Sequence, residues 1–110
     1  MMKKITATIF MLSAAAASTA YAQSNQEAAA LAGQSGCLVC HKTDGKLVGP
    51  GFKEVAEKYK DQAGAQQTLV QKVKKGGAGN WGRIPMPAHP QLSDETANTL
   101  VAWILKGAPS

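Results

Sequence analysis

Two cysteines stand three positions apart, and a histidine directly follows the second, in Cys37-Leu38-Val39-Cys40-His41. This C-x-x-C-H spacing is the attachment motif of c-type haem: both thiols bond to the haem vinyl groups, and the histidine lies under the iron. We expect one covalent haem c, with its iron, bound through Cys37, Cys40 and His41. The motif constrains the fold strongly, because a porphyrin supplies core that so short a chain lacks.

Three other uses of the cysteine pair explain less of the pattern. A disulfide, which is common in exported chains, does not explain why His41 directly follows Cys40. A thioredoxin-like redox pair needs a βαβ framework of more residues than this chain has. A structural zinc ion needs a fourth ligand, for which His89 is the one other histidine.

The first 22 residues are typical of a cleaved secretory signal peptide. Lys3 and Lys4 form a basic start, residues 5–17 an apolar stretch, and Ala20-Tyr21-Ala22 a small-x-small cleavage site. The apolar stretch is diluted by Ala, Ser and Thr and is shorter than the ~20 residues of a membrane-spanning helix. An uncleaved membrane anchor is therefore the weaker alternative, and we expect residues 23–110 to form one exported domain in the periplasm.

The mature part has few large apolar residues for a stable core. Its aromatic residues are Phe52, Tyr59, Trp81 and Trp103, and so small a domain needs a disulfide, a metal or a cofactor to be stable. Without Lys3 and Lys4 the chain keeps ten Lys or Arg against seven Asp or Glu, a net charge of +3. This mild charge, with no interleaved aromatic residues, argues against nucleic acid as a partner.

The hydrophobic pattern predicts an all-α domain of about four helices. Ser24 and Glu27 have the spacing of a capping box, which predicts a first helix over residues 24–36. Apolar residues at helical spacing predict a second helix from Phe52 to near Gly64 and a third over residues 66–75. Ser93 is the expected N-cap of a last helix. Residues 76–91 hold four Gly and three Pro without periodicity and are expected to form a loop.

Two residues compete to be the second ligand of the iron. Met86 is the one methionine that remains after cleavage, and Pro85 and Pro87 on either side stiffen its backbone. A thioether there binds iron at little cost in ordering entropy, although a methionine can also simply fill a core. His89 is the competitor. Ligation by His and Met leaves no open site on the iron, which suits an electron carrier rather than a catalyst.

Several segments together resemble a known family. They are Gly36 to His41 with the haem motif, Val48-Gly49-Pro50, Val55-Ala56-Glu57-Lys58-Tyr59, Asn80-Trp81-Gly82-Arg83-Ile84-Pro85-Met86-Pro87, and the closing helix with Trp103. In order and spacing the mature chain resembles the short bacterial class I cytochromes c of the c-551 type. The resemblance implies a class I cytochrome c fold over residues 23–110, with helices wrapped around one covalently bound haem.

The resemblance also implies roles for single residues. Pro50 would accept a hydrogen bond from His41 Nδ1–H, and Trp81 would donate its indole N–H to a haem propionate; a turn and core packing are the respective alternatives. Leu31 and Trp103 would lie in the contact between the terminal helices, where Gly36 would permit a close crossing.

The chain departs from the family pattern at three positions. Ala32 stands where an aromatic residue is common and should thin the contact between the terminal helices. Arg83 replaces a common proline and either pairs with a propionate or faces water. His89 replaces an asparagine that hydrogen-bonds the Met sulfur; its imidazole either donates to that sulfur or faces solvent.

The function that follows is single-electron transfer by a monomeric, non-enzymatic carrier. The resemblance implies a membrane quinol-oxidising complex as its donor and a periplasmic or membrane-bound terminal reductase or oxidase as its acceptor, and we expect no stable membrane insertion. Lysines 42, 46, 72, 74 and 75 form either a docking rim for an acidic partner or a solvated face. The rival functions are a peroxidase and a gas or ligand sensor, both of which need a labile or absent Met86.

Overall fold

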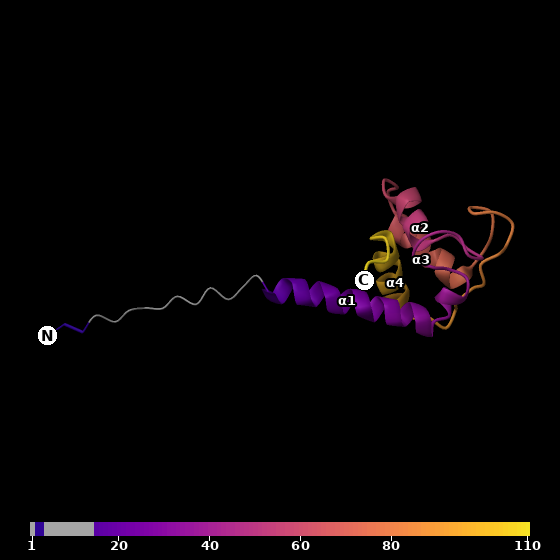
Figure 1. The fold of residues 1–110 in the computed structure, drawn as a ribbon. Coiled ribbons are helices and arrows are strands. Elements are labelled where there is room, and N and C mark those ends of the chain that lie inside the picture. The colour runs from indigo at the N-terminus through magenta and orange to yellow at the C-terminus, as the bar shows by residue number, and fades with distance from the viewer. Residues whose placement is uncertain (1, 4–14) are drawn as a thin grey trace.

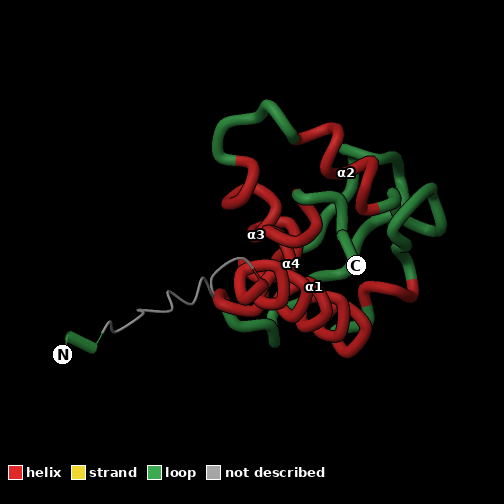
Figure 2. The backbone as a smooth tube through the Cα atoms, turned by 60° about the vertical axis from the view of Figure 1, so that its left-hand side comes forward, coloured by secondary structure: helices red, strands yellow, loops and turns green. Residues whose placement is uncertain are grey.

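Four α-helices and one short 3-10 helix make up the fold in the computed structural model, which describes residues 2, 3 and 15–110. They are α1 (Ala15–Gln34), η1 (Cys37–Val39), α2 (Phe52–Tyr59), α3 (Ala65–Lys75) and α4 (Asp94–Leu105). Within these residues there is no strand, only one isolated bridge between Gly77 and Met86. The predicted all-α class is confirmed, as Figure 2 shows. No helix in the described part is both long and apolar enough to cross a membrane.

Helix α4 is the centre of the domain, because it contacts each of the other three helices. Figure 1 shows α1 running along one side of the body with α4 beside it. Leu100 and Val101 on α4 are almost completely buried. The other buried apolar side chains come from all four helices and the C-terminal turn: Ala28, Ala32, Phe52, Val55, Tyr59, Ala65, Leu69, Val70, Ala97, Trp103, Ile104 and Ala108.

The ends of the later helices follow the local sequence. Ser93 Oγ accepts a hydrogen bond from Thr96 N at 3.1 Å, which is the N-cap that the sequence predicts for α4. At the start of α2, Gly51 N donates to the Glu54 carboxylate at 3.3 Å. Helix α2 ends at Tyr59, so its predicted end near Gly64 is wrong by five residues, and turns join it to α3, which begins one residue before its predicted start.

The first helix differs from its prediction at both ends. It begins at Ala15 and not at Ser24, so the predicted N-cap lies inside α1, as does the Ala20-Tyr21-Ala22 motif. Alanine is the best helix former, and the alanine-rich sequence before Ser24 continues the helix in the full chain. The basic start and the apolar stretch of the signal peptide fall mostly in residues 4–14, outside the described residues.

The contact between the terminal helices is present, but Gly36 does not make it. Ala28 and Ala32 form the buried face of α1, one helical turn apart, with at most 2% of their surface exposed. Gly36 lies beyond the end of α1 with φ +79°, and a Cβ there would meet no atom within 4 Å. The predicted role of Gly36 in a close helix crossing is wrong; its glycine serves a left-handed turn that leads into η1.

Candidate haem site

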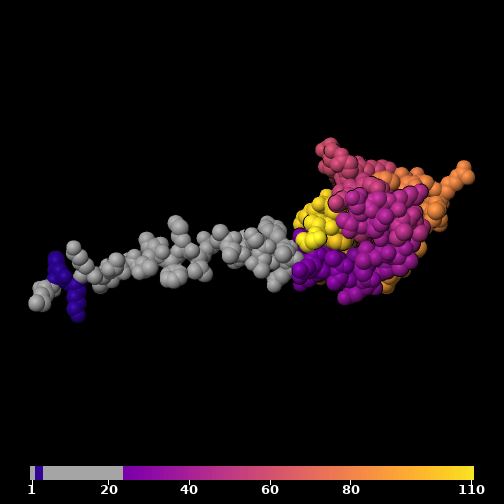
Figure 3. Space-filling model, viewed as in Figure 1, coloured from indigo at the N-terminus to yellow at the C-terminus, as the bar shows by residue number. Residues whose placement is uncertain are grey.

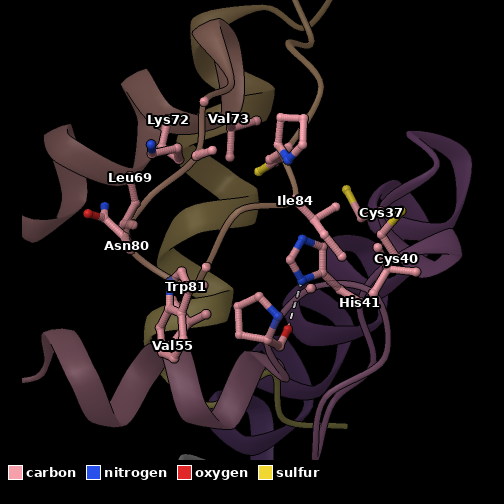
Figure 4. Close-up of a pocket in the computed structure, with 18 of the residues that line it drawn as sticks. Cys37, Cys40, His41, Val55, Leu69, Lys72, Val73, Asn80, Trp81 and Ile84 are labelled. Carbon is pink, nitrogen blue, oxygen red and sulfur yellow. Dashed lines mark hydrogen bonds between the residues drawn. The ribbon is translucent and has the colours of Figure 1, made fainter.

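An apolar cavity of about 360 Å³ opens between the helices and the two long loops. Its floor is formed by α2, α3 and α4, and the residues from these helices include Val55, Leu69, Leu100, Val101 and Ile104. This volume lies in the range of cavities that enclose cofactors and other small molecules. Figure 4 shows Cys37, Cys40 and His41 on one wall of the cavity, and Leu69, Val73 and Trp81 across from them.

One tight turn brings the three motif residues to the same wall. The turn begins at Gly36 in the left-handed conformation and continues through η1. Cys37 O then accepts hydrogen bonds from Cys40 N at 3.3 Å and from His41 N at 2.9 Å. Residues 36–52, called the attachment segment below, thus place both thiols and the imidazole beside the cavity.

The environment of Cys37 is unlike that of a redox-active thiol. Burial raises the pKa of the Cys37 thiol above its ordinary value, and a hydrogen bond with its own backbone opposes this only in part. Thioredoxin-like pairs work by the opposite shift, since a lowered pKa supplies their reactive thiolate. The Cys37 site therefore lacks the lowered thiol pKa on which a cycling dithiol depends.

The His41 ring is held on three sides. Its Nδ1 lies 2.7 Å from Pro50 O, so the hydrogen bond that the resemblance implies is present. Phe52 stacks on the ring at a centroid distance of 5.3 Å and an interplanar angle of 22°. Gly49 lies so close that a Cβ there would be 2.6 Å from His41 Cε1.

The Pro50 contact also fixes which imidazole nitrogen is protonated. A backbone carbonyl oxygen only accepts hydrogen bonds, so Nδ1 must carry the proton. The lone pair of Nε2 is then available to a metal, and orienting contacts of this kind are typical of metal-binding histidines.

Met86 lines the same cavity. It belongs to the loop of residues 76–91, called the methionine loop below. Met86 N donates to Gly77 O at 2.8 Å, and Gly77 N donates to Met86 O at 3.0 Å. A Cβ at Gly76 would lie 2.4 Å from Met86 O, so a larger residue cannot replace this glycine without moving the loop. The structure thus brings Cys37, Cys40, His41 and Met86, each predicted from the sequence, to one cavity.

Trp81 and Arg83 line the mouth of the cavity and not the core. Trp81 is 41% exposed, so packing in the protein core does not describe it. Lys58 Nζ lies 4.4 Å from the centroid of the Trp81 ring. Figure 3 shows this part of the methionine loop, coloured orange, projecting from the body of the protein.

His89 lies away from the residues that line the cavity. It does not line the cavity, its Nδ1 is 3.5 Å from Gln91 Nε2, and its backbone N donates to Val73 O at 3.0 Å. Within the described residues no group of three or more His, Cys, Asp or Glu comes together as such a metal site would require.

The five lysines that the sequence offers as a docking rim or a solvated face differ in their surroundings. Lys46 and Lys72 line the cavity. Lys74 forms an ion pair with Asp94 at the start of α4, which is a structural contact between α3 and the last helix. Lys42 and Lys75 are exposed.

Sequence reasoning missed three contacts of the site: Gly49 and Phe52 beside His41, and Lys58 over Trp81. The first two had a signal, since Gly49 and Phe52 flank Pro50 in the sequence. The third had none, because Lys58 and Trp81 are far apart in the chain and meet only in the fold.

Comparison with known proteins agrees with this geometry. The family model of cytochrome c matches residues 25–108. Cytochrome c-551 of Azotobacter vinelandii is 59% identical over 70 residues, which is 64% of this chain and 84% of the relative. Cytochrome c-551 of Allochromatium vinosum is 49% identical over 75 residues, 68% of this chain and 80% of the relative. The crystal structure of wild-type cytochrome c552 of Nitrosomonas europaea superposes with a TM-score of 0.70 at 43% identity, over 72% of this chain and 98% of that one.

Proposed function

The chain belongs to the cytochrome c family, with a class I fold and one covalently attached haem c, and from this premise we propose that it is an exported single-electron carrier whose iron is bound by His41 and Met86. The observation that carries the proposal is the shared cavity: His41, with Nε2 free to bind a metal, and Met86 line the same apolar space.

The residues present fit the haem. The cavity is apolar, as a porphyrin face requires, and both thiols lie at its wall beside His41. The space that Gly49 leaves beside the His41 ring would be filled by any Cβ. Cys37 and Cys40 would hold the group covalently, and the bound haem supplies an iron that gains and loses one electron.

His41 and Met86 would have different tasks at the iron. His41 would bind through Nε2, with Pro50 O orienting the ring through Nδ1–H. Met86 would supply the sixth ligand from the methionine loop, and a thioether there raises the potential relative to a second histidine. With both ligands in place the iron has no open position, so this site supports a carrier and leaves no room for a substrate.

The mouth of the cavity would hold the propionates. Trp81 would donate its indole N–H to one of them, since a half-exposed tryptophan at an apolar opening presents a polar edge to such a group. Lys46, Lys72 and Arg83 line the same cavity and bring positive charge to it.

The proposed location is the periplasm. Cleavage after Ala22 would remove the sequence that extends α1, and Ser24 would then lie at the new N-terminus, where its capping box with Glu27 can form. The mature protein would act as a monomer, accepting electrons from a membrane quinol-oxidising complex and passing them to a periplasmic or membrane-bound reductase or oxidase.

Replacing Met86 tests the ligand assignment. Met86→Ala should keep its covalent haem, lose the sulfur-to-iron charge-transfer band of the ferric state, and bind cyanide readily, since the sixth position is then open. His89→Ala is the control and should behave as wild type. If Met86→Ala instead stays low-spin, keeps the wild-type potential and resists cyanide, Met86 is not the ligand. A wild-type protein that binds cyanide or peroxide as readily as the variant would point to the peroxidase or sensor.

A further inference from the structure

Lys58 joins helix α2 to the methionine loop in two ways. Its Nζ lies 4.4 Å from the centroid of the Trp81 ring, within the range of a cation–π interaction. The same ammonium donates a hydrogen bond to Asn80 O at 2.9 Å. One side chain on α2 therefore contacts both the backbone and a ring of the loop, and Figure 4 shows Trp81 beside the α2 residue Val55.

A third contact anchors this junction in the core. Asn80 Nδ2 donates to Tyr59 Oη at 3.3 Å, and Tyr59 is only 5% exposed. Lys58, Tyr59, Asn80 and Trp81 together are called the Lys58 clamp below. Because Tyr59 is packed in the core, the clamp ties a surface loop to a fixed part of the protein.

The loop has little else to hold it at this point. Gly79 and Gly82 flank Asn80 and Trp81 with φ of +113° and +119°, and a Cβ at either would meet no atom within 4 Å. The backbone bond from Gly79 N to Gly82 O, 2.9 Å, closes the turn on itself and not onto the body. Apart from the hydrogen bond that Trp81 would donate to a propionate, the position of the Asn80–Trp81 pair thus depends on the side chains of the clamp.

We propose that Lys58 is a positioning residue, which fastens the methionine loop to α2 and thereby keeps Met86 on the iron. This inference rests on the proposed ligation by Met86. The chain runs from Trp81 to Met86 in five residues, two of them Gly82 and Pro85. Release of the clamp frees the side of the loop that lies before Met86, while the Gly77–Met86 hydrogen bonds and the bond from His89 N to Val73 O remain as attachments.

The rate at which cyanide replaces Met86 in the ferric holoprotein measures this effect, because the loop must open before the new ligand enters. Lys58→Met removes the charge and the donor but keeps a chain of similar length. A cation–π contact at a partly exposed site corresponds to about a two- to fivefold change in an equilibrium, so we expect replacement to be about fivefold faster once the hydrogen bond is also lost.

Two further variants separate positioning from charge. Lys58→Arg keeps a cation that stacks on aromatic rings and donates hydrogen bonds, and it should restore the wild-type rate to within about twofold. Lys60→Met is the matched control. Lys60 lies on the same helix end but pairs with Glu57 at 2.6 Å, so its loss removes the same charge without touching the loop.

Hydrogen exchange of the Met86 and Gly77 amides gives a readout that does not depend on the ligand. Both amides should exchange faster in Lys58→Met and at wild-type rates in Lys58→Arg and Lys60→Met. Equal cyanide and exchange rates in wild type and Lys58→Met would overturn the proposal, and so would an equal acceleration in Lys60→Met. A wild-type protein without the sulfur-to-iron band would contradict ligation by Met86 itself, and amide exchange would still decide whether the clamp holds the loop.

Discussion

The attachment segment and the methionine loop frame the same cavity but are held differently. In the attachment segment, hydrogen bonds cross from one limb to the other, from Gly49 N to Cys40 O at 2.7 Å and from Phe52 N to Lys42 O at 2.9 Å. In the methionine loop two bonds join Gly77 to Met86, one bond runs from His89 N to Val73 O on α3, and the clamp holds the Asn80–Trp81 pair.

The support beneath the two segments differs as well. Phe52, on which His41 stacks, is 2% exposed and meets Trp103 edge to face at a centroid distance of 5.5 Å. The histidine is therefore connected through buried rings to α4. Trp81 in the methionine loop is 41% exposed, and its ring faces the ammonium of the exposed Lys58. The comparison indicates that the fold fixes the position of His41 more firmly than that of Met86, so that Met86, the second ligand proposed above, is the one that we expect the protein to release.

Removal of the haem should have the largest effect, because both segments depend on it. In the Cys37→Ala, Cys40→Ala variant the haem has no covalent attachment, and the few apolar side chains do not offset the entropy of ordering the chain. We expect the cooperative thermal transition in circular dichroism to disappear. The holoprotein of Lys60→Met, a surface change, should melt as wild type does. Strong helicity with a cooperative melt in the haem-free chain would show that the helices are stable without the porphyrin.

A methyl group at Gly49 should strain the attachment segment. The Cβ of Gly49→Ala would lie 2.6 Å from His41 Cε1, and neither Pro50 O nor the Phe52 ring leaves the imidazole room to retreat. Overpacking of this kind costs about 1–3 kcal/mol, which denaturant unfolding of the holoprotein would measure.

Gly33→Ala is the matched control for that change. A Cβ at Gly33 meets Leu38 Cδ1 at 3.8 Å, an ordinary contact, and alanine is favoured in a helix, so stability should stay equal or rise slightly. If Gly49→Ala were as stable as wild type, the His41 ring could move aside at no cost, and the fold would hold His41 no more firmly than Met86.

The sequence predicts the helices and the chemistry of the site better than the contacts between segments. Local signals are sufficient for α3, α4 and the start of α2, since caps such as Ser93 and apolar spacing act within a few residues, but they place the end of α2 five residues too late. The start of α1 was wrong because Ser24 caps a helix only where the preceding residues do not continue it. Gly36 was misjudged because a small residue suits both a close crossing and a left-handed turn, and only the backbone angle distinguishes them.

The residues around the haem site divide in the same way. The motif spacing alone predicts that Cys37, Cys40 and His41 share one turn. The close approach of Gly49 to His41 and the contact of Lys58 with the Trp81 ring depend on how the loops pack. No spacing in the sequence encodes those distances.

A smaller change should loosen the methionine loop alone. Tyr59→Phe keeps the buried ring but removes the hydroxyl that accepts the Asn80 hydrogen bond. A hydrogen bond of this type contributes about 1 kcal/mol or less, so the Met86 amide should exchange up to about fivefold faster. The Gly49 amide in the attachment segment serves as the internal reference. An equal increase at both amides would mean that the two segments open together, which would contradict the difference in how the two segments are held.

His89 should have the smallest effect, because it lies outside the cavity. We expect the reduction potentials of wild type and His89→Asn to follow the same profile from about pH 5 to about pH 8, the interval in which histidines commonly change charge. Potentiometry checks this. A potential that rises at low pH in wild type but not in the variant would place the imidazole near the iron after all.

Cyanide titration of the ferric wild-type protein, followed in the near-infrared, tests the central claim most directly. With a preset His41 and a releasable Met86, the sulfur-to-iron band should be present at the start and should fade in proportion to the cyanide bound, while the haem stays attached to the protein. Absence of the band before cyanide is added, or a band that persists when cyanide is fully bound, would contradict the assignment of Met86 as the ligand that the methionine loop holds on the iron.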